Sequence, residues 1–190
     1  LQAIQQLGYH VAYCGQKTHY GVALLSRHPF VSVQKGFVGD TEAEQKRLIG
    51  GEFLVNGQRI HVLNGYFPQG ESQDHPVKFP NKRRFYANLL SHLQTACDKQ
   101  QALIIMGDMN VSHRDLDIGI GEDNRKRWLR TGKCSFLPEE REWLQQRIED
   151  GKRENRSVWM QPWMRIAALF IHIAGAGWLV MQTFSPREND

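Results

Sequence analysis

Cysteine is scarce in this chain of 190 residues: Cys14, Cys97 and Cys134 are the three thiols, and they lie far apart. An odd number at such wide spacing predicts neither a disulfide framework nor a zinc site. A basic region followed by an apolar core, as in a signal peptide, is missing from the amino end. These absences favour a reducing compartment, and we expect a cytoplasmic protein.

The net charge of the chain is compatible with a polyanionic partner but is not sufficient to predict one. Apolar residues make up 41% and charged residues 23% of the sequence, which is typical of a soluble globular domain. The formal charge of +4 is mildly basic. It is also clumped, because residues 124–133 hold five cations in ten positions. The length predicts one domain with a sizeable core.

The first half of the chain has the composition of β-strands. An initial segment at 1–8 resembles the last turns of an amphipathic helix that ends on a glycine, which indicates a fragment. Asn56-Gly57 is the strongest short signal for a β-hairpin. The predicted strands are residues 9–13, 21–26, 30–33, 48–55 and 59–64.

A helix and a further strand follow. Apolar residues recur at helical spacing from 83 to 99, and the run at 103–106 is too short for a helix and reads as a buried strand. The order strand, helix, strand favours two sheets, or one sheet layered with helices. A second helix is predicted to start near Pro138, where acidic residues suit the helix dipole.

The stretch after the strand at 103–106 carries the most chemistry. Gly107 is predicted to break the strand, which places Asp108 and Asn110 at its carboxyl end, where α/β proteins bind ligands. A carboxylate and an amide can hold a hard cation, orient water or stabilise a developing oxyanion. An Asx turn, in which both side chains bond the local backbone, explains the two residues equally well.

Three loops contain further polar candidates. Tyr66 and Gln69 lie in a Gly- and Pro-containing loop at 64–71 and can contact a phosphate or a base edge, although Tyr66 also suits a packing role. The segment 15–20, with Lys17, His19 and Tyr20, is more typical of a solvated turn. The carboxylates of Asp115 and Asp117 suit capping better than metal binding.

Four motifs together resemble the bacterial exonuclease III family of the endonuclease/exonuclease/phosphatase superfamily. They are Asn64-Gly-Tyr-Phe-Pro-Gln-Gly-Glu71, Asp74-His-Pro-Val-Lys-Phe-Pro80, Met106-Gly-Asp-Met-Asn110 and the long motif from Asp117 to Trp143. The resemblance covers about residues 1–149. It implies a four-layered α/β sandwich, with two packed sheets and outer helices. It also implies Mg²⁺- or Mn²⁺-dependent hydrolysis of DNA: 3′-to-5′ exonuclease action on duplexes, abasic-site incision and 3′-end repair.

The resemblance assigns roles to six residues. Tyr66 matches the active-site tyrosine near the scissile phosphate, Asp108 the aspartate that activates water, and Asn110 the amide that stabilises the transition state. Asp108 and Asn110 also match metal ligands. The positions that match DNA contacts are Arg47, Gln69 and Lys78. The implied partner is duplex DNA with 3′ ends or abasic sites, bound by a monomer, and no protein partner is implied.

The departures from the family predict a weakened enzyme. The principal metal-binding glutamate and the carboxyl-terminal Asp-His pair are not found in this sequence, and Asp74-His75 belongs instead to the loop after Tyr66. We therefore expect a sandwich that lacks terminal strands, is poorly soluble and is nearly inactive.

Residues 151–190 form a second region, outside the nuclease-like domain at 1–150. Residues 166–184 carry no formally charged side chain. The length of this segment is near the lower limit for a membrane span. We prefer an unrelated tail, either read out of frame or of foreign origin, to a membrane anchor. Two rival functions stay open: a superfamily phosphatase, against which the long basic motif argues, and a non-catalytic DNA-binding remnant.

Overall fold

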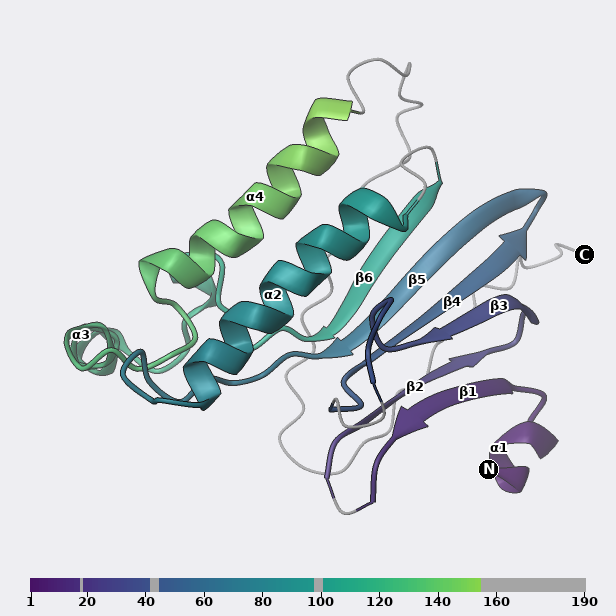
Figure 1. Ribbon diagram of the computed structural model, residues 1–190, viewed down its shortest axis with the longest axis horizontal. Helices are drawn as coiled ribbons and strands as arrows, with labels where there is room; N and C mark the ends of the chain where they lie inside the picture. Colours follow the sequence, from purple (N-terminus) through teal and green to yellow (C-terminus); the bar gives the residue numbers. More distant parts are fainter. Residues whose placement is uncertain (18, 42–44, 98–100, 155–190) are drawn as a thin grey trace, which may run out of the picture.

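The computed structural model describes residues 1–17, 19–41, 45–97 and 101–154, with side chains up to residue 146 (Figure 1). The elements are α1 (Gln2–Gln6), β1 (His10–Gly15), β2 (Gly21–Ser26), β3 (Phe30–Lys35), β4 (Leu48–Val55), β5 (Gln58–Tyr66), α2 (Lys78–Thr95), β6 (Ala102–Asp108), a 3₁₀ turn (Asp115–Asp117), α3 (Glu122–Arg130) and α4 (Pro138–Glu154).

The described strands form two sheets. One contains the antiparallel pair β1-β2, and the other has the order β3-β4-β5-β6. The β4–β5 hairpin turns at Asn56 and Gly57, whose φ angles of 51° and 79° are those of the predicted two-residue turn. Strand β6 pairs parallel to β5, and α2 makes the crossover between them. The carboxyl ends of β5 and β6 therefore meet at one edge.

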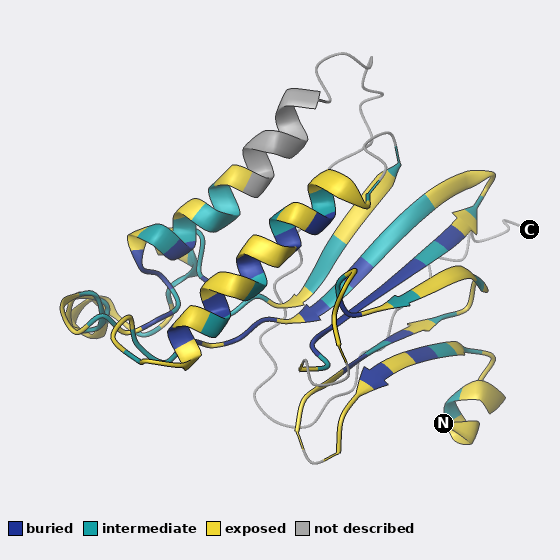
Figure 2. Cartoon of the chain, in the orientation of Figure 1, coloured by how far each residue is buried: buried dark blue, intermediate teal, exposed yellow. Residues whose placement is uncertain are grey.

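Two apolar cores lie on the two faces of the larger sheet. The smaller sheet packs on one face through Leu24, Ile49 and Val62, and α2 packs on the other through Leu63 and Tyr86. Adjacent residues of β5 enter opposite cores, as the period of two in a strand requires. Figures 1 and 2 show α2 and α4 side by side, with the buried residues of α2 turned to the sheet. The predicted α/β architecture, with two sheets and outer helices, is confirmed.

Several element boundaries differ from the sequence-based prediction. Strand β5 runs to Tyr66 and β6 to Asp108, because the two strands remain paired past Gly65 and Gly107. Helix α2 begins at Lys78 rather than at 83, since Pro80 is tolerated in the first turn of a helix. The Nδ1 atom of His75 accepts hydrogen bonds from the N–H groups of Val77 and Lys78, which caps this start.

The predicted tail lies almost entirely beyond the residues that the structure describes. Its apolar part, residues 166–184, falls outside them, so the proposed division at residue 150 stays a prediction. Within the described ranges, none of the helices has the length and apolar character to cross a membrane.

Candidate active site

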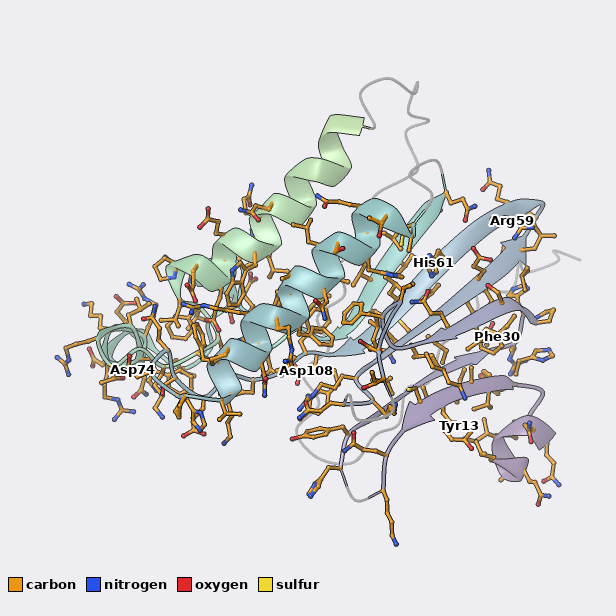
Figure 3. The ribbon with its side chains drawn as sticks, viewed as in Figure 1. Tyr13, Phe30, Arg59, His61, Asp74 and Asp108 are labelled. Carbon is orange, nitrogen blue, oxygen red and sulfur yellow. The ribbon has the colours of Figure 1, made fainter. Side chains whose placement is uncertain are left out.

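Parallel pairing places Tyr66 beside Asp108. The two residues are register partners at the carboxyl ends of β5 and β6, and register partners project to the same face of a sheet. That face is the one covered by the smaller sheet, and both side chains are exposed. Figure 3 shows Asp108 where the two strands end, near the first turns of α2. A phenol and a carboxylate thus share one solvent-facing edge.

Two glycines make this pairing close. A Cβ atom at Gly107 would lie 2.0 Å from the carbonyl oxygen of Gly65, and the φ angle of Gly107 is 120°, a conformation reserved for glycine. A Cβ atom at Gly65 would lie 2.6 Å from the ring of Phe67. The sequence prediction that Gly107 breaks the strand was wrong, because Gly107 lets the strand continue for one more residue and end at Asp108.

Asn110 joins the pair through the Asx turn that the sequence left open. The Asn110 N–H donates to Asp108 Oδ1 at 3.0 Å, and its Nδ2 donates to the carbonyl of Phe67 at 2.9 Å. Its φ angle of 51° supports the same tight turn. The turn does not exclude chemistry, because it leaves Asp108 Oδ2 and Asn110 Oδ1 without a hydrogen-bond partner among the described residues.

Arg47 ties a third strand to this edge. It is 7% exposed, its Nη1 donates to the carbonyl of Tyr66 at 3.1 Å, and its own carbonyl accepts from the Tyr66 N–H at 2.8 Å. The guanidinium lies 4.8 Å from the Tyr66 ring centre and 3.7 Å from that of Tyr20. Tyr20 was assigned to a solvated turn and is instead part of the site. The chain carries no local signal for this contact, because it joins the β1–β2 loop to the residue that precedes β4.

Gln69 and Lys78 lie in the segment that leads from β5 into α2. Gln69 Oε1 accepts from the Glu71 N–H at 2.8 Å, so its amide nitrogen is the group left for a ligand. Lys78 Nζ lies 2.5 Å from Glu71 Oε2 on an exposed surface. This ion pair lowers the pKa of Glu71. Arg47 thus contacts Tyr66, Asn110 contacts Asp108, and the strand register places Tyr66 beside Asp108. Gln69 and Lys78 lie in the neighbouring segment.

The buried side chain of Lys82 connects the two loops of the site on their protein-facing side. Lys82 is 0% exposed, and its Nζ donates to the carbonyls of Asn110 at 2.8 Å and Gln69 at 3.2 Å and to the carboxylate of Glu140. Glu140 in turn accepts from the N–H groups of Ser135 and Leu137. One ammonium group therefore connects the segments after β5 and after β6 to the start of α4.

The clump of positive charge forms the exposed helix α3, which the sequence analysis did not predict as a helix. Arg125 pairs with Glu122, and this hydrogen-bonded pair lowers the pKa of Glu122 to about 2. Arg127 and Arg130 are exposed and form no ion pair within the described part of the chain. Two guanidinium groups are therefore available to an anionic partner.

The donor set for a metal is partial. Among the described residues, no group of three or more His, Cys, Asp or Glu side chains is placed to hold an ion. Asp108 Oδ2 and Asn110 Oδ1 are oxygen donors of the kind that Mg²⁺ prefers, and water would complete the octahedron around an ion held there. Asp115 and Asp117 do not join them: Asp115 pairs with Arg141, and Asp117 Oδ2 accepts from the Arg114 N–H.

Comparison with known proteins identifies the family to which this α/β fold belongs. The chain belongs to the endonuclease/exonuclease/phosphatase family, whose model matches residues 1–186. That match extends into the region that the sequence analysis set apart as a tail.

Individual relatives narrow the comparison. The chain is 53% identical to exodeoxyribonuclease III of Haemophilus influenzae over 151 residues, which cover 80% of this chain and 57% of the relative. Among solved structures, it resembles the Neisseria 3′ phosphatase NExo bound to a product DNA hairpin, with a TM-score of 0.65, 30% identity and coverage of 78% and 53% of the two chains. An AP endonuclease from Archaeoglobus fulgidus gives a TM-score of 0.64 at 28% identity, with coverage of 78% and 53%. The chain spans about half the length of these relatives.

Proposed function

We propose that this chain carries the phosphate-cleaving edge of a metal-dependent DNA phosphodiester hydrolase of the exonuclease III type. The observation that carries the proposal is the register pairing of Tyr66 with Asp108 at the carboxyl ends of two parallel strands, with Arg47 hydrogen-bonded to Tyr66 and Asn110 to Asp108. The substrate is duplex DNA, attacked at 3′ ends or abasic sites. This choice is supported by the relatives, which include a 3′ phosphatase with a DNA product and an AP endonuclease.

Each residue has a part in the reaction that suits its chemistry. The Asp108 carboxylate acts as the general base that takes a proton from the attacking water. The Asn110 amide and the Tyr66 phenol stabilise the charge that develops on the phosphate oxygens. Asp108 and Asn110 would hold Mg²⁺ or Mn²⁺, which would supply positive charge to the phosphate and lower the pKa of water. Arg47, Gln69 and Lys78 bind backbone phosphates without reading sequence.

Two oxygen donors from the described residues would hold an ion weakly. We therefore infer that this chain cleaves DNA slowly at low Mg²⁺ concentration and faster when the Mg²⁺ concentration is raised. A cytoplasmic location and a monomeric state are part of the proposal. The location is in keeping with three cysteines that form no disulfide.

The test is a cleavage assay on 3′-labelled duplexes, one intact and one with an abasic site. Asp108→Asn should remove metal-dependent product, whereas Asp74→Asn should not, because Asp74 is an exposed carboxylate in a loop away from Asp108 (Figure 3). Equal rates for the two variants would refute the assignment of Asp108. Binding of duplex DNA without metal-dependent product would instead identify a DNA-binding remnant, and release of phosphate from 3′-phosphorylated ends alone would identify a phosphatase.

A further inference from the structure

The ammonium group of Lys82 uses all three of its N–H donors. Its Nζ atom donates to the carbonyl of Gln69 at 3.2 Å, to the carbonyl of Asn110 at 2.8 Å and to Oε1 of Glu140. A lysine carries three donors and no acceptor, so none is left for a ligand. The side chain is 0% exposed, and DNA therefore cannot reach it. Any part that Lys82 plays in the reaction must act through the groups that it holds.

The two carbonyl groups belong to the two loops of the candidate site. Gln69 lies in the segment after β5, and the proposed function assigns its side chain to the DNA backbone. Asn110 lies after β6, and the proposed function assigns its side chain to the metal ion and the phosphate. Because both carbonyls accept from one nitrogen atom, the two backbones are held at a fixed separation.

The backbone at both points needs this support. Asn110 has a φ angle of 51°, and Gly70, next to Gln69, has a φ angle of 89°. A residue other than glycine keeps such a left-handed conformation only where its surroundings hold it. A Cβ atom at Gly70 would lie 2.9 Å from Cδ of Lys82, so this loop packs directly on the lysine side chain. Without the ammonium group, both loops would be free to shift.

Glu140 fixes the direction of the ammonium group. Its Oε2 atom accepts from the N–H groups of Ser135 at 2.8 Å and Leu137 at 2.9 Å, which ties the carboxylate to the start of α4. The carbonyl of Ser135 also accepts from the N–H of Ser112, so the segment after β6 is attached here at a second point. The Lys82–Glu140 pair carries no net charge. Its effect on the site is therefore a matter of position rather than of electrostatic attraction.

From these contacts we infer that Lys82 is a positioning residue, which keeps Asn110 in place for the metal ion and Gln69 in place for DNA. The inference rests on the proposed function for the identity of the two ligands. It predicts that loss of the ammonium group weakens the binding of both, although neither ligand touches Lys82. Substitution of a residue that orients a metal ligand typically lowers metal affinity by about 10–100-fold.

The test compares two double variants, each of which removes one ion pair between α2 and α4 (Figure 1). Lys82→Met with Glu140→Gln removes the buried pair, and Arg83→Met with Glu139→Gln removes an exposed pair formed by the neighbouring residue of each helix. Both variants keep the net charge. Binding of Mn²⁺ is measured by electron paramagnetic resonance without DNA, and binding of a labelled duplex by fluorescence anisotropy without metal.

The buried-pair variant should bind Mn²⁺ about tenfold more weakly than the wild-type chain, and it should also bind the duplex more weakly. The exposed-pair variant should match the wild type in both measurements. Equal binding by the two variants would overturn the inference. Urea unfolding shows whether each variant is folded under the assay conditions. If the buried-pair variant does not fold, Glu140→Gln takes its place, because it keeps Lys82 and an oxygen that accepts from it. Glu140→Gln should then weaken Mn²⁺ binding more than Glu139→Gln does, and equal binding would overturn the inference.

A double-mutant cycle distinguishes positioning from a general loss of structure. Asn110→Ala should weaken Mn²⁺ binding much less in the buried-pair variant than in the wild-type chain, because the ligand is already displaced there. A full effect of Asn110→Ala in both backgrounds would mean that Lys82 does not act through Asn110.

Cleavage of the labelled duplex keeps this inference apart from the proposed function. A chain that cleaves DNA, but whose buried-pair variant binds Mn²⁺ and DNA as the exposed-pair variant does, disproves only the positioning role of Lys82. A chain that does not cleave DNA, but whose buried-pair variant binds both more weakly, disproves only the proposed hydrolase.

Discussion

Lys82 and Glu140 form an ion pair that is completely enclosed, with both side chains 0% exposed and Nζ 2.5 Å from Oε1. The pair joins the first half of α2 to the start of α4, and Lys82 also donates to the carbonyl of Asn110. A buried charge is tolerated only when it is paired and hydrogen-bonded. The candidate site therefore depends on a contact between residues that are remote in sequence and do not face the substrate edge.

Replacing Lys82 by methionine should destabilise the protein by roughly 3–5 kcal/mol, because the Glu140 carboxylate is left buried and unpaired. Adding Glu140→Gln should recover part of the loss, since an amide oxygen still accepts from the N–H of Ser135 or Leu137. The measurement is urea unfolding at neutral pH. Arg83→Met, which breaks an exposed pair with Glu139, should change stability by only about 0–1 kcal/mol. A Lys82→Met chain as stable as the Arg83→Met chain would contradict this account.

Gly107→Ala should be among the most damaging small substitutions in the chain. The added methyl would lie 2.0 Å from the Gly65 carbonyl oxygen, in a backbone conformation that alanine rarely adopts. We expect a loss of several kcal/mol, roughly 2–4 by the usual size of such backbone strain together with a clash. Gly57→Ala is the control, because nothing lies within 4 Å of its Cβ position although its φ angle is also positive. The comparison is made by thermal unfolding, and equal melting temperatures for the two variants would argue against the close approach of β5 and β6.

The sequence was sufficient for the elements that depend on local chemistry. The Asn56-Gly57 turn, the strand at Gly21–Ser26 and the α4 start at Pro138 were predicted, because each is determined by residues within one or two turns of chain. Helix α3 was missed because Glu122–Arg130 is almost wholly polar, with no buried residue to produce an apolar period.

The site was predictable only in part, and the missing part is tertiary. The chemistry of Asp108 and Asn110 was readable, but their closeness to Tyr66 follows from a register between strands that α2 separates in the chain. Tyr20 reaches Arg47 from another sheet. Lys82 lies in a run of charged residues typical of solvated surface, and only packing against α4 selects it for burial.

Removing the Tyr20 ring should weaken DNA binding, because this ring positions the guanidinium of Arg47. Tyr20→Leu deletes the aromatic face 3.7 Å from the guanidinium, a contact worth about 0.5–2 kcal/mol, or roughly twofold to thirtyfold in affinity. Tyr13→Leu is the matched control, since Tyr13 is an exposed tyrosine of β1 with Lys35 5.6 Å from its ring (Figure 3). Fluorescence anisotropy with a labelled duplex measures both. An equal effect of the two substitutions would mean that Tyr20 does not position Arg47.

Stability should fall as the pH drops below about 6.5, the ordinary pKa of histidine. Burial lowers the pKa of His92, whose two ring nitrogens have no hydrogen-bond partner among the residues that the structure describes. Burial also lowers the pKa of His61, against a smaller opposing effect of Glu52. Because both pKa values are lower in the folded state, the unfolded chain binds more protons below pH ~6.5, and the free energy of unfolding decreases there. His92→Phe should make this decrease shallower. Urea unfolding at about pH 7.5 and about pH 5.5 provides the measurement, and identical pH dependence in both chains would show that His92 does not contribute.

Helix α3 should contribute affinity for DNA without sequence preference. Arg127 and Arg130 are its exposed, unpaired cations, so replacing both by glutamine should weaken binding to unrelated duplexes by a similar factor. It should also reduce the slope of log K against log salt by about two, because each phosphate contact releases about one counterion. The double substitution of Arg59 and Lys35 by glutamine removes the same charge from β5 and β3 and controls for net charge. If the slope changes equally in both double variants, the effect comes from the net charge of the whole molecule and not from contacts made by α3.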